Sequence, residues 1–228
     1  MIGLLPAAGK AERMHHLPKY LLPVPGGYLL EHHVTGMRAV GCEPVWVGCN
    51  LDNIGLIFDY TEDSAYVYIP DTHDTMTQTV LGVRLHIAPD EKVLFSMPDT
   101  YWDSPNVFLP LQMALENGAD IAVALFVARF DQRNGGMCRI TGNQVTEVVD
   151  KPGNGDWRYI WGALAWKPVF WDYMQPEDPH IGYALPRAIA AGLDVRAVLC
   201  DGDYWDCGVP EDYFACIRSL GETVHASA

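Results

Sequence analysis

The sequence predicts an α/β fold in which a mainly parallel central sheet is covered by helices on both faces. Three observations lead to this prediction. Short apolar runs of the kind that form buried strands recur through the first half of the chain. Stretches of about a dozen residues that favour helix separate these runs. After residue 130 the pattern changes to short β-rich runs joined by a turn. Because parallel strands must be joined by crossovers, the alternation in the first half predicts βαβ units.

The elements of the first half follow in order along the chain. The apolar run of residues 1–6 is followed at once by Ala7-Ala8-Gly9, which predicts a buried first strand that opens into a tight turn. Further strands are expected at residues 45–49, 66–69, 93–97 and 121–127. Helices are expected between them, at residues 30–40, 77–88 and 107–117.

The second half begins with a hairpin signal. A Gly142-Asn143 turn lies between two β-rich runs within residues 139–146. An apolar strand at residues 160–166 and helices at residues 181–191 and 211–220 follow. We therefore expect a Rossmann-like three-layer sandwich whose parallel sheet carries an antiparallel extension. With no linker and no internal repeat, residues 1–228 are expected to form one domain.

The composition restricts the ligands that the protein can bind. Its 228 residues carry a formal net charge of −14, so a nucleic acid would be repelled. A small polyanion must be met locally by a few of the 15 Lys and Arg residues, by backbone N–H groups or by a metal. The six cysteines form no C-x-x-C pair, and there is neither a charged leader before an apolar run nor a long apolar stretch. We expect a cytoplasmic protein with reduced cysteines, no nucleic-acid or membrane partner, and a homo-oligomeric state left open.

The loop after the first predicted strand has the composition of a phosphate site. Small residues, Ala7-Ala8-Gly9, let backbone N–H groups approach phosphate oxygens closely, and two cations, Arg13 and Lys19, follow. A Walker A loop is excluded because Gly-Lys-Ser/Thr is absent, and no G-x-G-x-x-G dinucleotide fingerprint follows a strand. The alternative is a simple turn with two solvated charges.

Two aspartates are candidates for one shared metal site. Asp99 follows the apolar run 93–97, which places it at the carboxyl end of a buried strand, where open α/β sheets bind ligands. Asp206 lies in a turn that leads into a helix beginning at Pro210. Mg²⁺ prefers one or two carboxylates together with phosphate oxygens and water. The adjacent pairs His15-His16 and His32-His33 are not expected to form a metal site, because neighbours on a helix point in different directions.

These segments resemble the signatures of the nucleotidyltransferase superfamily, in its sugar-1-phosphate nucleotidyltransferase form. Gly9, Arg13 and Lys19 fall on the pattern G-x-G-x-R-[LM] followed by P-K, whereas Ala11 replaces the second glycine. Residues 204–213, YWDCGVPEDY, resemble W-x-D-[IV]-G-T-P-E-D-[LY], the most specific match in the chain. The resemblance implies a Mg²⁺ site formed by Asp99 and Asp206. It also implies catalytic roles for Arg13, Lys19 and Lys151.

Weaker elements of the resemblance lie between the two ends of the chain. Asp150-Lys151-Pro152 resembles the family's E-K-P element, and Trp161-Gly162 stands where N-A-G is usual. The resemblance implies substrate binding by Gly136, Asp150, Lys151, Trp161 and Gly162. It implies nucleotide binding by Leu5, Ala7, Ala8, Gly9, Gln78 and Pro98. The Gln78 amide favours a pyrimidine nucleotide, UTP, dTTP or CTP, because an amide can pair with a pyrimidine edge.

The resemblance implies transfer of a nucleotidyl group from an NTP to a small phosphorylated substrate, a sugar 1-phosphate, with release of pyrophosphate. Such chemistry depends on positioning and charge neutralisation rather than on a nucleophilic side chain. Three alternatives stay open at this point. One is a cytidylyltransferase for a non-sugar phosphate such as phosphocholine, a phosphonate or a polyol phosphate. The second is an inert nucleotide-sugar sensor. The third is a glycosyltransferase, which should show an Asp-x-Asp at the central strand end, where this chain has Pro98-Asp99-Thr100.

Overall fold

A large mixed sheet forms the centre of the molecule in a computed structural model, which describes residues 1–11, 14, 17–58, 65–69, 74–129, 135–153 and 155–226. Within these residues the sheet has nine strands in the order β5-β4-β1-β6-β11-β8-β12-β10-β9. Its parallel half consists of β5 (Ala65–Tyr68), β4 (Val45–Cys49), β1 (Ile2–Ala7) and β6 (Val93–Ser96). The predicted α/β class and its parallel first half are confirmed.

The second half of the sheet is mixed. β11 (Tyr159–Trp166) runs antiparallel to both β6 and β8 (Ile121–Val127), and β12 (Val195–Leu199) runs parallel to β8. The hairpin of β9 (Gly136–Thr141) and β10 (Gln144–Asp150) closes this edge. Gly142 in its turn has φ +60°, a left-handed conformation that glycine adopts without strain. The antiparallel extension was therefore predicted correctly, but the parallel strand β12 within it was missed.

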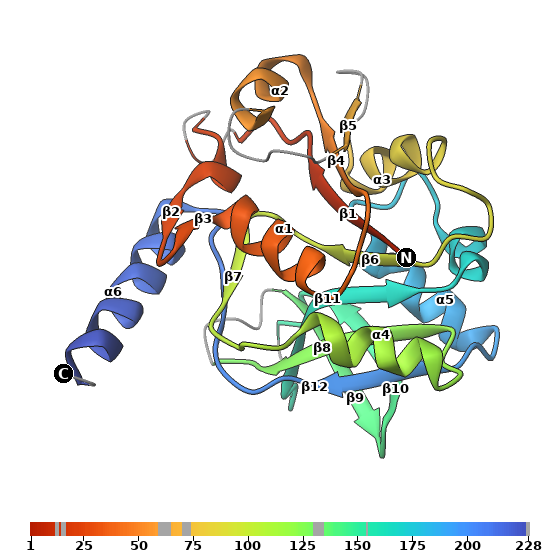
Figure 1. The fold of residues 1–228 in the computed structure, drawn as a ribbon. Coiled ribbons are helices and arrows are strands. Elements are labelled where there is room, and N and C mark those ends of the chain that lie inside the picture. The colour runs from red at the N-terminus through yellow and green to blue at the C-terminus, as the bar shows by residue number, and fades with distance from the viewer. Residues whose placement is uncertain are drawn as a thin grey trace.

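Apolar side chains alternate between the two faces of the sheet, as a period of two requires. Leu5 of β1 and Leu94 of β6 face one side, where they pack with α1 (Leu29–Ala39), α2 (Leu51–Phe58) and α4 (Phe108–Glu116). Leu4 and Phe95 face the other side, where α3 (Met76–Arg84) and α5 (Ala184–Ala190) cover the sheet. The three layers can be followed in Figure 1. This arrangement is the expected three-layer sandwich.

The predicted helices agree with the structure except in four places. The helix expected at residues 181–191 is divided into a 3-10 turn (Ile181–Tyr183) and α5, and 3-10 helices also form at Lys19–Leu21 and Pro168–Tyr173. α2 was missed because it is only eight residues long and lies in a short strand-to-strand connection. The short strands β7 (Thr100–Trp102), β13 (Tyr204–Asp206), β2 (Pro23–Val24) and β3 (Gly27–Tyr28) were missed because two or three residues show no periodicity.

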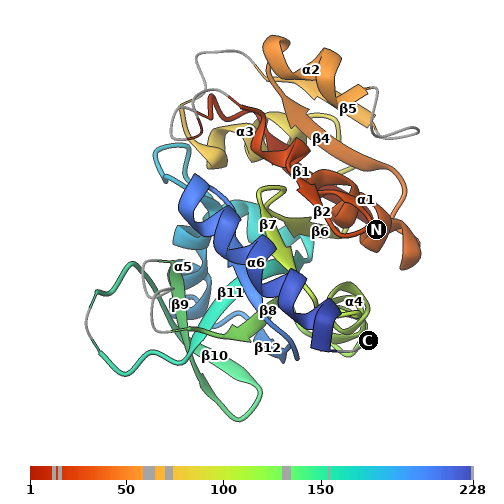
Figure 2. The ribbon, with the colours of Figure 1, turned by 90° about the vertical axis from the view of Figure 1, so that its left-hand side faces the viewer.

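The C-terminal helix α6 (Pro210–Ala226) packs on a third apolar cluster rather than on the main sheet. The cluster joins Val24, Leu29, Tyr101, Trp205 and Cys216. Tyr101 and Trp205 of this cluster belong to the small sheet β13-β7, so α6 supports the strand that carries Asp206. Figure 2 shows α6 across the front of the molecule. All six cysteines are free thiols. No helix in the described part of the chain is both long and apolar enough to cross a membrane.

Candidate active site

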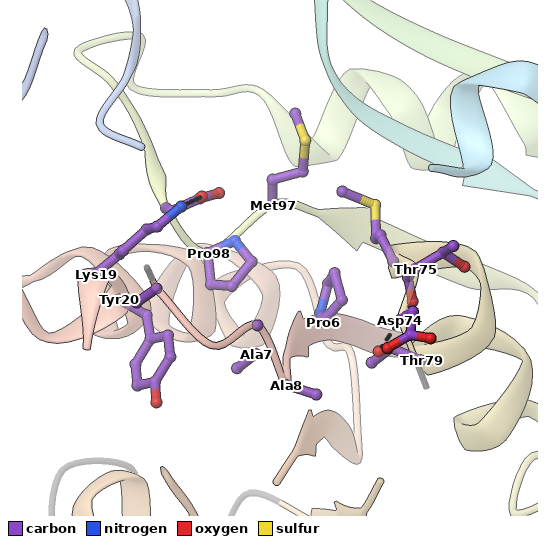
Figure 3. A pocket seen from close by; sticks show the side chains of 14 residues that line it. Pro6, Ala7, Ala8, Lys19, Tyr20, Asp74, Thr75, Thr79, Met97 and Pro98 are labelled. Carbon is purple, nitrogen blue, oxygen red and sulfur yellow. Dashed lines mark hydrogen bonds and ion pairs between the residues drawn. The ribbon is translucent and has the colours of Figure 1, made fainter. Parts of the chain in front are cut away.

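A cavity of about 180 Å³ lies beyond the carboxyl ends of β1 and β6. The order of strands reverses here, because β4 lies on one side of β1 and β6 on the other. Open α/β sheets bind ligands at such a point. In Figure 3 Lys19 lies at one end of this first cavity and Asp74 at the other, with the chain after β1 between them. The cavity is lined by six of the residues predicted from sequence: Ala7, Ala8, Gly9, Lys19, Pro98 and Asp99.

Two asparagines hold the loop that follows β1. Asn50 Nδ2 donates a hydrogen bond to the carbonyl of Ala8 (3.0 Å), and Asn53 Nδ2 donates to those of Ala7 (3.2 Å) and Gly9 (3.4 Å). Asn50 Oδ1 also accepts from the Asn53 N–H (2.9 Å), which caps the start of α2. These bonds fix the loop beside the cavity. The backbone N–H groups of such a loop can donate to phosphate oxygens. Sequence analysis missed both residues, although an Asn directly after a strand and before a helix is a capping signal.

Ala11 has a left-handed backbone conformation, which is unusual for a residue other than glycine. Its φ is +50°, in the left-handed region, and Lys151 with φ +48° is the other non-glycine residue of this kind in the described part of the chain. Such strain costs about 1–2 kcal/mol in an L-residue other than glycine, and it concentrates at functional sites. Ala11, which stands at the second motif glycine, therefore has a backbone conformation that a glycine would adopt with less strain. Arg13, the predicted cation of this loop, lies outside the described residues.

Asp99 lies in a turn that a buried histidine supports. Thr100 N–H and Oγ1 both donate to the Met97 carbonyl, which closes the turn after β6. His33 Nε2 donates to the Thr100 carbonyl (2.8 Å), and Ser96 Oγ donates to His33 Nδ1 (2.9 Å). The carbonyl can only accept, so the proton of the neutral ring is on Nε2. Burial, reinforced by neighbouring His32, lowers the pKa of His33 to about 3. His33 is thus a neutral support of the Asp99 turn, a role that the sequence did not indicate.

Asp99, Asp206 and Lys19 converge on one point. β13 pairs with β7 so that Asp206 lies opposite Thr100, and the Cys207 N–H donates to the Asp99 carbonyl (2.9 Å). Lys19 Nζ lies 3.4 Å from Asp99 Oδ2. Asp206 Oδ1, Lys19 Nζ and Asp99 Oδ2 are 2.8, 3.6 and 3.7 Å from the position that a β-carbon on Gly208 would take. The three charged groups come from distant parts of the sequence and form one cluster, and Gly208 leaves room for it.

The donor set of this cluster fits a hard divalent cation. Desolvation, followed by the charge of Asp99, raises the pKa of Asp206, while the Gly208 N–H and Lys19 act in the opposite direction. Two carboxylates held close together thus carry more negative charge than Lys19 offsets. In the described part of the chain no three His, Cys, Asp or Glu side chains are grouped to hold a metal alone. This is the arrangement Mg²⁺ favours, with one or two carboxylates and the rest of its shell from phosphate and water.

The N-terminus of α3 forms the far wall of the first cavity. Thr75, Met76 and Thr79 line it. The Gln78 side chain does not, because its Oε1 accepts from the Asp74 and Thr75 N–H groups (2.7 and 3.3 Å) in a capping box with Thr75. Its carbonyl oxygen is thus engaged in capping the first turn of α3.

A second cavity of about 270 Å³ lies between β9, β10, β11 and the 3-10 turn before α5. Asp150 forms its charged wall: Oδ2 accepts from Tyr183 OH (3.1 Å) and Oδ1 from His180 Nε2 (3.2 Å). Trp161 forms an aromatic wall and is only 3% exposed. A β-carbon on Gly136 would lie 2.0 Å from Trp161 Nε1, so this glycine leaves room for the indole ring. His180 and Tyr183 were missed by sequence analysis and have no motif that could have revealed them.

Besides Gln78, three predicted residues lie outside both cavities, and Asp206 lies in the charged cluster without lining either cavity. Leu5 is fully buried in the core beneath the loop. Gly162 faces the opposite side of the sheet from Trp161, where a β-carbon would meet Phe126 and Tyr204 at 2.8 and 2.9 Å. Lys151 is exposed directly after β10, beside Asp150.

A fixed loop at the switch point of an α/β sheet, with two carboxylates and a lysine beside it, defines a protein that binds nucleoside phosphates. The chain belongs to the MobA-like NTP transferase domain family, whose model matches residues 3–193. The protein is therefore a nucleotidyltransferase, and the membership of the nucleotidyltransferase superfamily expected from its motifs is confirmed. The family generally uses divalent metal ions.

Solved structures show the same fold at low sequence identity. A protein of Bacillus anthracis assigned as a glucose-1-phosphate thymidylyltransferase, in complex with sucrose, has a TM-score of 0.83 and 15% identity over 96% of this chain and 94% of its own. A UDP-glucose pyrophosphorylase complexed with UDP-glucose has a TM-score of 0.80 and 19% identity over 98% and 100%. A UTP-bound UGPase of Acinetobacter baumannii has a TM-score of 0.78 and 16% identity over 97% and 94%.

Proposed function

We propose that the protein transfers a nucleotidyl group from a pyrimidine NTP (UTP, dTTP or CTP) to a sugar 1-phosphate, in a Mg²⁺-dependent reaction that releases pyrophosphate. The observation that carries the proposal is the convergence of Lys19, Asp99 and Asp206 beside the loop after β1. The structural neighbours that bind UTP or UDP-glucose support the choice of substrates.

The charged cluster would work by positioning and charge neutralisation. Asp99 and Asp206 would hold Mg²⁺, which when bound neutralises the negative charge that develops at the α-phosphate. Lys19 lies next to these carboxylates and would orient the phosphates of the two anionic substrates. We assign Arg13 to the leaving pyrophosphate and Lys151 to the phosphate of the second substrate. No nucleophilic side chain is needed, because the phosphate oxygen of that substrate attacks the α-phosphorus directly.

The second cavity would receive the remainder of the phosphorylated substrate. Asp150 can accept hydrogen bonds from hydroxyl groups, and Trp161 supplies a flat apolar wall. The same cavity supports a second candidate, a cytidylyltransferase for phosphocholine. The rings of Trp161, His180 and Tyr183, together with the Asp150 carboxylate, also suit a quaternary ammonium group.

The test is pyrophosphate release with Mg²⁺ across ATP, GTP, CTP, UTP and dTTP. Each would be paired with a panel of sugar 1-phosphates, phosphocholine and aminoethylphosphonate. We expect release with one pyrimidine NTP and one sugar 1-phosphate, and its loss on addition of EDTA. Release with phosphocholine alone would favour the second candidate, and NTP binding without any release would favour the inert sensor.

A further inference from the structure

The second cavity contains a histidine that belongs to no motif and is not explained by packing alone. The His180 side chain is 21% exposed, and its ring lies 4.9 Å from that of Tyr183 and 5.9 Å from that of Trp161. Both ring nitrogens are engaged. Nδ1 accepts from the Gly182 N–H (3.2 Å), and Nε2 lies 3.2 Å from Asp150 Oδ1.

These contacts determine the tautomer of the ring. A backbone N–H can only donate, so Nδ1 carries no proton and the neutral ring is protonated on Nε2. The Nε2–H group therefore donates to Asp150. Protonation of Nδ1 would set two donors against each other, and burial, although opposed by Asp150, lowers the pKa of His180. The ring thus presents a neutral donor of fixed direction to the carboxylate.

The segment that carries His180 is itself fixed to the nucleotide side of the molecule. Thr75 Oγ1 donates to the Pro176 carbonyl (3.1 Å), and the Met76 N–H donates to the Pro179 carbonyl (3.1 Å). Thr75 and Met76 line the first cavity. Within the segment, Asp178 pairs with Arg187 and accepts from the Gln175 N–H (3.2 Å). The segment of residues 175–180 therefore connects the two cavities and holds His180 in place.

We propose that His180 is a positioning residue of the second cavity: it fixes the Asp150 carboxylate so that hydroxyl groups of the phosphorylated substrate can donate to it. This inference rests on the proposed function in taking that substrate to be a hydroxyl-bearing phosphate. A carboxylate has about four lone-pair sites, and His180 and Tyr183 occupy one on each oxygen. The remaining sites accept from hydroxyls, which a trimethylammonium group cannot supply.

Two substitutions separate the contact with Asp150 from the contact with Gly182. H180N places an amide near the Nδ1 position, so it can still accept from the Gly182 N–H but does not reach Asp150. H180Q is one methylene longer and can place its amide N–H near the Nε2 position, so it restores the donor to Asp150. The exposed His86 provides a control, H86N, away from both cavities.

The measurement is KM for each substrate, with the best sugar 1-phosphate from the panel. We expect H180N to raise KM for the sugar phosphate on the order of tenfold, the effect of losing one hydrogen bond to a charged group, with KM for the NTP unchanged. H180Q should recover most of this loss. A D150N/H180N double variant should be no worse than D150N, because His180 acts through Asp150. Equal effects of H180N and H180Q, a parallel rise in both KM values, or additive losses in the double variant would overturn the proposal.

A binding measurement keeps this test independent of turnover. Calorimetric titration with α-D-glucose 1-phosphate and with ribitol 5-phosphate should show weaker binding to H180N than to H180Q, even if no NTP supports release. Absence of turnover with any pair, together with this difference, would sink the proposed function and leave the role of His180 standing. Binding of phosphocholine alone, or equal binding of the hydroxyl-bearing phosphates to both variants, would sink the role of His180.

Discussion

A neutral histidine supports a carboxylate at each of the two cavities, but the fully buried His33 and the partly exposed His180 are connected to their carboxylates differently. Beside the first cavity, His33 holds the backbone of Thr100 and leaves the Asp99 carboxylate free to face Lys19 and Asp206. In the second cavity, His180 and Tyr183 donate to the Asp150 carboxylate itself. A carboxylate held only through its backbone is suited to a cation. One already surrounded by neutral donors is suited to orienting an organic ligand.

This difference predicts the largest effect at Asp99. D99N removes a charge from the cluster that we propose binds Mg²⁺ and the triphosphate, so we expect kcat to fall by about a hundredfold or more while the fold is kept. The measurement is steady-state pyrophosphate release with circular dichroism as the check on folding. The exposed D90N variant is the matched control. Full activity in D99N would remove the basis for distinguishing the two carboxylates.

The second prediction concerns the loop after β1. N53A removes the donors to the Ala7 and Gly9 carbonyls, so the loop beside the first cavity loses part of its support while the second cavity is untouched. We expect KM for the NTP to rise by about fivefold, which is the value of roughly one neutral hydrogen bond, with KM for the phosphorylated substrate unchanged. N143A, in the exposed β9–β10 turn, serves as the comparison. If both KM values rise in N53A, the two cavities are not independent in the way described.

The third prediction uses the lowered pKa of His33. The folded pKa of about 3 lies below the value near 6.5 of an unfolded histidine, so stability from the neutral ring is complete above about pH 6.5 and is lost as pH falls toward 3. We expect the free energy of unfolding to fall by up to about 1.4 kcal/mol per pH unit below pH 6.5 because of this group. H33Q should lack this part of the pH dependence.

Urea denaturation of the wild type and H33Q at pH 7.5 and 5.5 measures that difference directly. Comparing the two proteins cancels the contribution of other groups, including Asp206, whose raised pKa acts with the opposite sign. The same pH dependence in both proteins would mean that His33 is not held neutral beneath the Asp99 turn.

The smallest expected effect is at Ala11. A11G relieves a left-handed φ worth about 1–2 kcal/mol, but glycine also gains freedom in the unfolded chain, worth about 0.4–1 kcal/mol. We expect A11G to stabilise the protein slightly, by up to about 1 kcal/mol. A8G, at an ordinary φ, should destabilise it by a similar amount. Urea midpoints give both values, and equal losses in the two variants would contradict the strain at Ala11.

The first cavity was predictable because its features are local in sequence. Ala7-Ala8-Gly9, Lys19 and Asp99 each follow or flank a recognisable strand or motif, and the structure brings all of them to one cavity. Gln78 was identified in the same way, yet its side chain caps α3. A Gln at the third position of a helix can accept hydrogen bonds from the free backbone N–H groups at the helix start as readily as it can bind a ligand. A motif thus predicts a residue's place more reliably than the partner of its side chain.

The sequence by itself determined the α/β class, the family motifs at both ends of the chain, and the two aspartates that share a cluster. Periodicity and strand-end position depend on neighbouring residues, so they can be read from the chain directly. Only the tertiary structure decided the contacts that join distant segments. These are the pairing of β13 with β7, the hydrogen bonds of Asn50 and Asn53 to the loop after β1, and the contact of His180 with Asp150. These contacts depend on side-chain direction and on the packing of elements 30 or more residues apart, which no local pattern encodes.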